Sequence, residues 1–105
     1  MVFLETPVFT RQINVLVDDD QYLALQALLM VRPGAGDLIP DSGGLRKIRM
    51  RLAGRGKRGG ARVIYYWIKE WSQIYMLLAY AKNERADLRK EEIRTLGELV
   101  REELG

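Results

Sequence analysis

Two apolar runs near the middle of the chain most constrain its fold. Residues 62–68 (RVIYYWI) and 74–81 (IYMLLAYA) carry apolar side chains at both odd and even positions, and residues 69–72 (KEWS) between them are typical of a hairpin turn. A strand with two apolar faces lies inside a sheet. We therefore expect two antiparallel strands at the centre of a sheet, joined by a turn centred between Glu70 and Trp71.

The segment before this pair alternates between apolar and basic side chains. The alternation sets Ile48, Met50 and Leu52 against Lys47, Arg49 and Arg51. Successive side chains of a strand point to opposite faces, so the segment predicts a third strand with an exposed cationic face. In a meander of these strands, Arg62 is expected roughly opposite Ala79, close to Tyr80 and Lys82, at one edge of the sheet.

The remaining elements are mostly helices with recognisable starts. Thr6-Pro7 predicts a helix over about residues 6–16, and the acidic residues 18–20 predict the cap of a second helix that ends at Pro33-Gly34. Residues 36–44 are expected to form a loop, and Asp87 to cap a last helix. With a short strand at residues 2–4, the order is strand, two helices, three-stranded meander, helix. The length fits one domain, residues 1–105, of the α+β class.

Basic residues are concentrated in one quarter of the chain. Residues 45–69 hold nine Lys or Arg and no Asp or Glu, whereas acidic residues outnumber basic ones on both sides of this segment. Clustered like charges repel one another in a compact fold unless an anionic partner compensates them. The pattern therefore indicates binding to a phosphate group or an anionic polymer.

The sequence contains no Cys and no His. It therefore offers neither a thiolate nor an imidazole for catalysis or zinc binding, and we expect no metal site and no cofactor. Catalysis would have to use Lys, Arg, Tyr, Asn or carboxylates, which fits electrostatic stabilisation of phosphate chemistry. No apolar run approaches the roughly 20 residues that span a bilayer, and the first residues lack a charged leader, so we expect a cytoplasmic protein.

The predicted topology brings cations and tyrosines to one edge of the sheet, where the glycine-rich segment 54–60 also lies. Tyrosine rings stack on unpaired RNA bases, and basic side chains contact phosphates. The candidate RNA-binding residues are Arg46, Lys47, Arg49, Arg51, Arg55, Tyr65, Tyr66, Tyr80 and Asn83.

Residues 43–49 (GGLRKIR), 56–66 (GKRGGARVIYY) and 80–84 (YAKNE) together resemble the RelE/HigB superfamily of toxin–antitoxin toxins, in particular its HigB branch. The resemblance implies a RelE-like fold, in which an N-terminal strand and a helical hairpin pack on an antiparallel sheet that also carries a C-terminal helix. It further implies a ribosome-dependent mRNA endonuclease that contacts 16S rRNA and cuts mRNA in the A site. A helix-turn-helix antitoxin is the implied partner.

The resemblance also assigns catalytic roles. In that family the substrate's own 2′-OH attacks the adjacent phosphate and leaves a 2′,3′-cyclic phosphate and a 5′-OH, without a metal. Arg62 corresponds to the family's transition-state stabiliser, and Lys82 to a phosphate clamp or acid. Lys57 and Arg58 match the basic loop of the branch. Lys57 is our hypothesis for the base or its electrostatic substitute, because a cationic neighbourhood lowers the pKa of an ammonium group.

Two positions depart from the family pattern. Asn83 stands where many relatives have a second basic residue, and residues 84–105 contain no tyrosine to match the one that some relatives use. The individual acid and base roles therefore stay open.

Two alternative functions use the same cationic face. The first is a module that binds RNA, DNA or the ribosome without cleavage. The second is a gyrase inhibitor of the ParE branch, although the helical hairpin of that branch is usually longer and the cationic loop argues against it.

Overall fold

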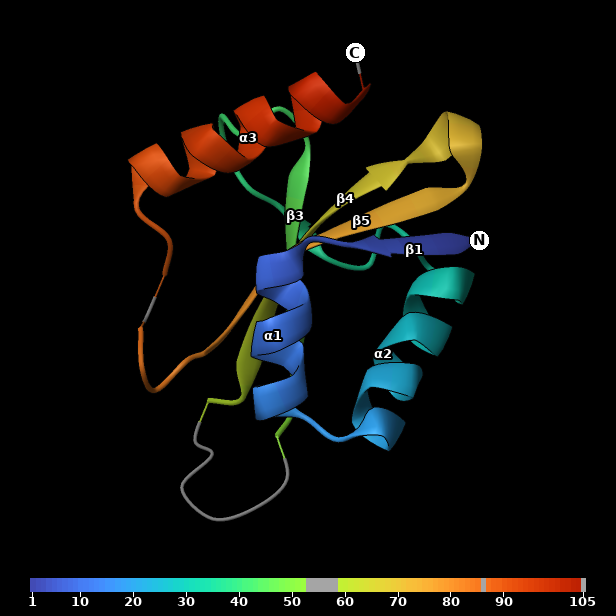
Figure 1. The fold of residues 1–105 in the computed structure, drawn as a ribbon, viewed down its shortest axis with the longest axis vertical. Coiled ribbons are helices and arrows are strands. Elements are labelled where there is room, and N and C mark those ends of the chain that lie inside the picture. Colours follow the sequence, from blue (N-terminus) through green and yellow to red (C-terminus); the bar gives the residue numbers. More distant parts are fainter. Residues whose placement is uncertain (53–58, 86, 105) are drawn as a thin grey trace.

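The protein folds around a mostly antiparallel sheet. The computed structural model describes residues 1–52, 59–85 and 87–104. Along the chain lie β1 (Val2–Glu5), α1 (Pro7–Leu16), α2 (Asp19–Val31), β2 (Asp37–Leu38), β3 (Leu45–Met50), β4 (Ala61–Ile68), a 3-10 turn (Lys69–Trp71), β5 (Gln73–Ala81) and α3 (Lys90–Leu104). The strand order is β1-β5-β4-β3-β2, and only β1 and β5 are parallel among these neighbours (Figure 1). The predicted α+β class is confirmed.

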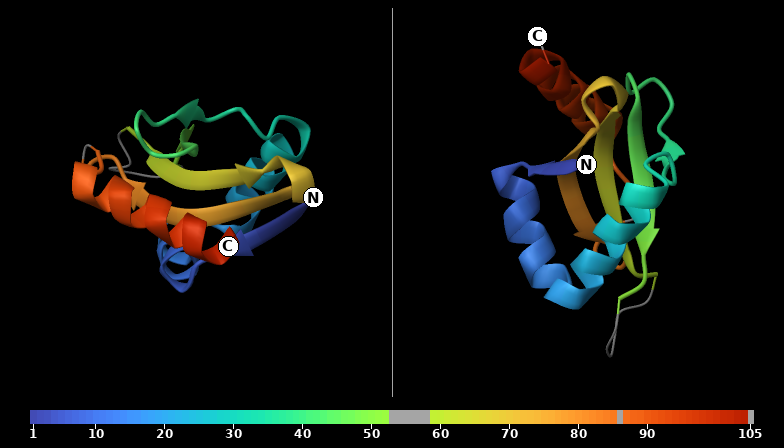
Figure 2. Two further views of the ribbon diagram at one scale, coloured as in Figure 1. Left: turned by 90° about the horizontal axis from the view of Figure 1, so that it is seen from above. Right: turned by 90° about the vertical axis from the view of Figure 1, so that its right-hand side faces the viewer.

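The two N-terminal helices begin at the predicted caps. The Thr6 hydroxyl accepts a hydrogen bond from the Phe9 N–H at 3.0 Å, and Pro7 occupies the first helical position. At the second helix, Asp18 and Gln21 form a reciprocal capping box. The right-hand view of Figure 2 shows α1 and α2 as a V beside the strands.

Each face of the sheet has its own apolar cluster. One face, the hairpin face, packs against the helical hairpin and contributes Ile48, Met50, Val63, Tyr65, Met76 and Ala79. The other, the α3 face, contributes Leu45, Ile64, Leu77 and Tyr80, which pack with Leu88 and Val100. The two central strands are therefore covered on both sides, as their apolar pattern predicts. Among the described residues no helix is long and apolar enough to cross a membrane.

An extra residue in β5 changes the register of the central hairpin. From Ile68, which pairs with Gln73, to Tyr65, which pairs with Met76, the pairing fits a turn centred between Glu70 and Trp71, as predicted. Ile64 then pairs with Leu78, so Leu77 is the added residue of a β-bulge.

Two side chains bond the backbone beside the bulge. The Thr6 hydroxyl donates to the Leu77 carbonyl, and the Ala79 N–H donates to the Gln12 side-chain oxygen, both at 2.9 Å. Beyond the bulge Arg62 pairs with Tyr80. The expectation that Arg62 lies opposite Ala79 was wrong by one residue, because it assumed an unbroken ladder.

Three other expectations were also inaccurate. The segment predicted as a loop contains β2, which pairs with β3, and the Ile39 N–H donates to the Leu45 carbonyl at 2.9 Å. The strand with alternating apolar and basic side chains, β3, ends at Met50, so Arg51 and Leu52 of the alternating pattern lie beyond it. The last helix begins at Lys90, and Asp87 accepts a bond from the Leu88 N–H at 2.9 Å instead of capping the helix.

Tyr65 is a hydrogen-bonded core residue, which leads to a prediction about stability. Its side chain is 0% exposed, and its hydroxyl accepts from the Gly36 N–H at 2.9 Å and donates to the Pro33 carbonyl at 2.7 Å. Replacing Tyr65 by Phe leaves both backbone groups without this partner. We expect the free energy of unfolding to fall by about 1–3 kcal/mol, measured by urea denaturation at neutral pH. An unchanged denaturation midpoint would contradict this role.

Candidate active site

A row of three side chains crosses the α3 face at the end where β3 and β5 finish. Arg49 of β3 pairs with Arg62 of β4, and Arg62 pairs with Tyr80 of β5. Side chains directly opposite each other on neighbouring strands have Cβ atoms about 4.5–5.5 Å apart. The strands therefore hold two guanidinium groups and one phenol side by side, and Lys47 lies on the same face two residues before Arg49.

Arg62 is buried and held from one side. Its side chain is only 7% exposed, and Nη1 donates to the Gly59 carbonyl at 2.8 Å and the Ala61 carbonyl at 3.2 Å. The hydrogen bonds described for Arg62 both start from Nη1. A buried charge is costly unless it is well hydrogen-bonded, so an anion that binds the guanidinium through Nε or Nη2 would add to its stabilisation.

Tyr80 brings a buried hydroxyl to the same row. Its side chain is 6% exposed, and Oη has no hydrogen-bond partner among the described residues. Burial raises the pKa of Tyr80 and the carboxylate of Asp87 raises it further, against the opposite effect of Arg85 and Arg62. The hydroxyl therefore stays protonated near neutral pH and is a hydrogen-bond donor rather than a base.

The ring of Tyr80 is less available than its hydroxyl. The Arg85 guanidinium lies 5.1 Å from the ring centroid, in cation–π contact. With one side of the ring under Arg85 and most of the residue buried, the structure does not favour the predicted base-stacking role.

Two glycines before β4 allow close approach of the neighbouring strand ends, including Lys82 after β5. The Lys82 N–H donates to the Gly60 carbonyl at 2.9 Å. A Cβ at position 59 would lie 2.8 Å from Lys82 Cγ, and one at position 60 would lie 2.0 Å from the Met50 carbonyl oxygen. Gly60 also has φ +64°, which disfavours other residues. The absence of a side chain at Gly59 leaves room for Lys82 after β5, and its absence at Gly60 lets the chain before β4 lie against the end of β3.

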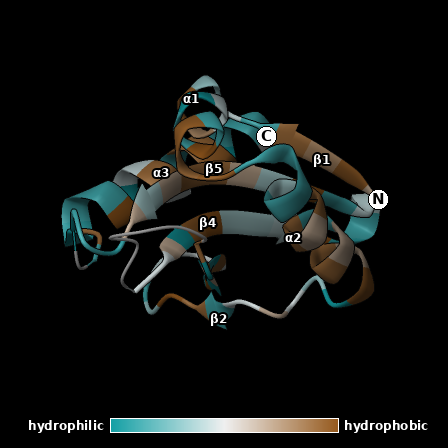
Figure 3. Cartoon of the chain, turned by 90° about the horizontal axis from the view of Figure 1, so that it is seen from below, coloured by the Kyte–Doolittle hydropathy of each residue, from teal (hydrophilic) through white to brown (hydrophobic). Residues whose placement is uncertain are grey.

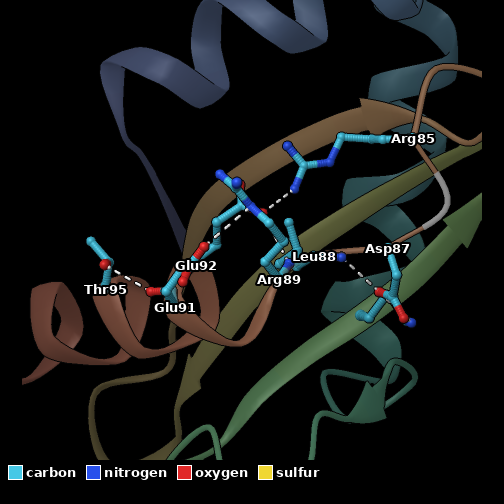
Figure 4. A network of polar contacts seen from close by, with 8 residues as sticks. Arg85, Asp87, Leu88, Arg89, Glu91, Glu92 and Thr95 are labelled. Carbon is cyan, nitrogen blue, oxygen red and sulfur yellow. Dashed lines mark hydrogen bonds and ion pairs between the residues drawn. The ribbon is translucent and has the colours of Figure 1, made fainter.

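The segment between β5 and α3 is fixed by ion pairs. Arg85 and Arg89 both contact the carboxylate of Glu92, on the first turn of α3 (Figure 4). The hydrogen bond from Arg85, with a second from the Arg89 N–H, lowers the pKa of Glu92 to about 2. This network anchors the chain just after Lys82 to α3.

A further ion pair joins this segment to the α3 face. Lys47 Nζ lies 3.2 Å from the Asp87 carboxylate. Burial acts to raise the pKa of Asp87, but the Leu88 N–H and Lys47 outweigh it and keep the pKa below its ordinary value. Asp87 is therefore an anionic group beside an otherwise cationic row.

The structure brings together some of the predicted site residues. Arg49, Arg62, Tyr80 and Lys82 meet at one end of the α3 face, with Lys47 beside them. Arg51 is exposed just after β3 and, with Arg49 and Gly59, lines a hollow of about 460 Å³. Asn83 is exposed directly after Lys82.

Other predicted residues lie elsewhere. Arg46 lies on the hairpin face, where Nη1 donates to the carbonyls of Gly34 and Gly36 at 3.1 and 2.8 Å. Tyr65 is in the core of that same face. Tyr66 is on the α3 face but pairs with Leu45, at the end that α3 covers. The predicted residues Arg55, Lys57 and Arg58 lie outside the described residues.

Sequence reasoning missed the residues that surround Tyr80. Arg85 covers the ring, Glu92 anchors Arg85, and Asp87 was predicted only as a helix cap. The charged run that follows β5, residues 82–85 (KNER), was the available signal, since its first members were already candidates. Its pairing with α3 depends on the fold and could not be deduced from spacing.

The arrangement suits binding of a phosphate diester. Arg62 offers fixed N–H donors, Tyr80 a neutral O–H donor, and Lys82 and Arg49 positive charge. In the described part of the chain, no three His, Cys, Asp or Glu side chains lie close enough together to hold a metal ion.

A comparison with known families agrees with this fold. The family model for the RelE toxin of the RelE/RelB toxin–antitoxin system matches residues 8–104. The chain therefore belongs to the RelE family of toxins. It is the toxin of a toxin–antitoxin system, its partner is an antitoxin, and members of its family are generally endoribonucleases.

The Glu92 network predicts a dependence of stability on pH. Because folding lowers the pKa of Glu92 from 4.5 to about 2, the ionised carboxylate stabilises the fold above about pH 4.5, and this contribution disappears as the pH falls towards 2. We expect wild type to unfold at higher urea concentration than Glu92→Gln at pH 6. The two should converge by about pH 2. A constant difference across this range would show that the Arg85 and Arg89 contacts do not stabilise the ionised form.

Proposed function

We propose that this toxin belongs to the HigB branch and is a ribosome-dependent mRNA endonuclease of the cytoplasm. It contacts 16S rRNA, cuts mRNA in the ribosomal A site, and is neutralised by a helix-turn-helix antitoxin. The observation that carries the proposal is the Arg49–Arg62–Tyr80 row, with Lys82 beside it. Such a row offers donors and positive charge to a phosphate diester at the end of the sheet where β3 and β5 finish.

The proposed reaction needs no metal and no bound cofactor. The 2′-oxygen bonds to phosphorus, the bond from phosphorus to the 5′-oxygen breaks, and one proton leaves the 2′-OH while another reaches the 5′-oxygen. The products are a 2′,3′-cyclic phosphate and a 5′-OH. A base, an acid and cations that stabilise the charge of the phosphorane are sufficient.

The proposed roles of Arg62 and Tyr80 follow from their environments, whereas those of Lys57 and Arg58 follow from the family resemblance. Arg62 stabilises the negative charge of the transition state, because its guanidinium is fixed before substrate binds. Tyr80 donates a hydrogen bond to a phosphate oxygen or to the leaving oxygen, since its raised pKa keeps it protonated. Lys82 clamps the phosphate or acts as the acid. Lys57 remains our candidate base, and Arg58 a further phosphate contact.

Substitution of Arg62 tests cleavage itself. We expect Arg62→Ala to reduce cleavage by about 100-fold or more, because removal of one preorganised donor from a transition state has costs of this order. The measurement is a map of new 5′-OH mRNA ends after induction in cells, repeated in a purified translation system. Arg94→Ala, which removes an exposed arginine from α3, is the control and should keep the wild-type ends.

Three outcomes would contradict the proposal. Unchanged ends in Arg62→Ala would contradict the assigned site. Intact mRNA on programmed ribosomes with wild-type protein would indicate a module that binds without cleavage. Intact mRNA together with blocked DNA supercoiling would indicate a gyrase inhibitor.

A pair of tyrosine variants separates a role in the reaction from a role in the fold. Tyr80→Phe removes a hydroxyl that has no partner among the described residues, so we expect no loss of unfolding free energy but at least a tenfold loss of cleavage. Tyr65→Phe should show the opposite pattern, lower stability and cleavage near wild type under conditions where it is folded. Full cleavage by Tyr80→Phe would remove its hydroxyl from the mechanism.

A further inference from the structure

The outer surface of α2 is unusually apolar. Residues 21–31 contain no charged side chain. Leu23, Met30 and Val31 are 61%, 57% and 80% exposed, and Ala24, Ala27 and Leu28 are also exposed. A surface helix normally turns polar residues to solvent, so this composition is unexpected on an uncovered helix.

The exposed residues form one continuous surface, which we call the α2 arc: Leu23, Ala24, Ala27, Leu28, Met30 and Val31. At about 100° per residue, they span roughly 160° of the helix circumference without interruption by a polar side chain. Figure 3 shows α2 becoming brown beyond its teal N-terminal turn. Contiguous exposed apolar surface of this kind marks a protein–protein contact.

The α2 arc adjoins an open edge of the sheet. A hollow of about 250 Å³ lies between α2 and β3 and is lined by Ala24 and Leu28 on one side and residues 49–51 on the other. The Leu45 carbonyl accepts a hydrogen bond from the Ile39 N–H, so the backbone N–H and C=O groups of every second residue from Leu45 point away from β4, towards the β2 side. Lys47 pairs with β2 on this side. Arg49 has no strand partner there in the described chain.

We propose that the α2 arc and the adjoining edge of β3 bind the antitoxin, through an apolar segment that carries acidic side chains. The family pairs this toxin with an antitoxin, so such a partner exists whether or not the proposed cleavage is correct. Arg49 and Arg51 at the margin of the hollow favour acidic groups. An apolar surface without donors is unsuited to RNA.

The location also links binding to neutralisation. Arg49 belongs to the cationic row, so an acidic antitoxin group that pairs with it would compete with a substrate phosphate. This consequence rests on the proposed function, whereas the docking surface itself does not.

Two valines provide a matched test. Val31 on α2 is 80% exposed and Val15 on α1 is 83% exposed, and both lie in the last turn of their helices. We expect Val31→Glu to weaken binding of the purified cognate antitoxin by about tenfold or more in calorimetric titration, because it places a charge in an apolar contact. Val15→Glu should bind nearly as wild type. The uncharged double variant Leu23→Gln/Met30→Gln should also weaken binding, which separates loss of apolar contact from charge repulsion.

The outcomes are decided by binding and not by nuclease activity. Unchanged affinity for both α2 variants, or an equal loss in Val15→Glu, would overturn the proposal. If wild type is a dimer that Val31→Glu dissociates without a change in antitoxin affinity, the α2 arc is instead an interface between copies. If only cleavage on ribosomes falls, the arc contacts the ribosome and the proposal is wrong. A thermal unfolding midpoint equal to that of wild type would show that each variant is folded.

Discussion

The β-bulge at Leu77 is the constraint on which the site depends. Because side chains alternate between faces, one added residue in β5 moves every later side chain to the opposite face. Met76 therefore lies on the hairpin face while Tyr80 lies on the α3 face beside Arg62. Thr6 and Gln12 hold the backbone at this point, and Thr6 also caps α1. A single buried threonine thus connects the start of the helical hairpin to the placement of a residue on the other side of the sheet.

Electrostatics then determines what that side of the sheet can bind. Arg62 is buried beside Tyr80, and Arg85 lies over the tyrosine ring and is itself anchored by Glu92. Backbone carbonyls hold Arg62, and the carboxylate of Glu92 holds Arg85. The carboxylates described close to the row are both paired with other cations, Asp87 with Lys47 and Glu92 with Arg85. The arrangement therefore keeps positive charge concentrated without a strong internal counterion for Arg62, which is the condition under which an external phosphate binds most favourably.

Local patterns predicted much of the fold and only part of the site. The central hairpin, its turn, and the caps at Thr6 and Asp18 depend on short-range chemistry, so the sequence was sufficient for them. The bulge was not predictable, because the hydrogen bonds beside it come from residues more than sixty positions away.

For the site residues, strand alternation correctly separates Lys47 and Arg49 from the hairpin face. The same alternation puts Arg46 on the hairpin face, where its guanidinium donates hydrogen bonds to backbone carbonyls. Tyr65 was chosen for its proximity in sequence to Arg62, although odd positions of β4 face the helical hairpin.

The bulge also bears on how chains of this kind can change length during evolution. An insertion in the turn at Lys69–Trp71 lengthens a connection at the far end of the hairpin and leaves the pairing of Arg62 with Tyr80 intact. An insertion or deletion between Met76 and Tyr80 would exchange the two faces of the last part of β5. The tyrosine would then enter the helical core and an alanine would replace it beside the arginine. Gaps in an alignment of relatives should therefore be accepted in the turn and distrusted in the strand.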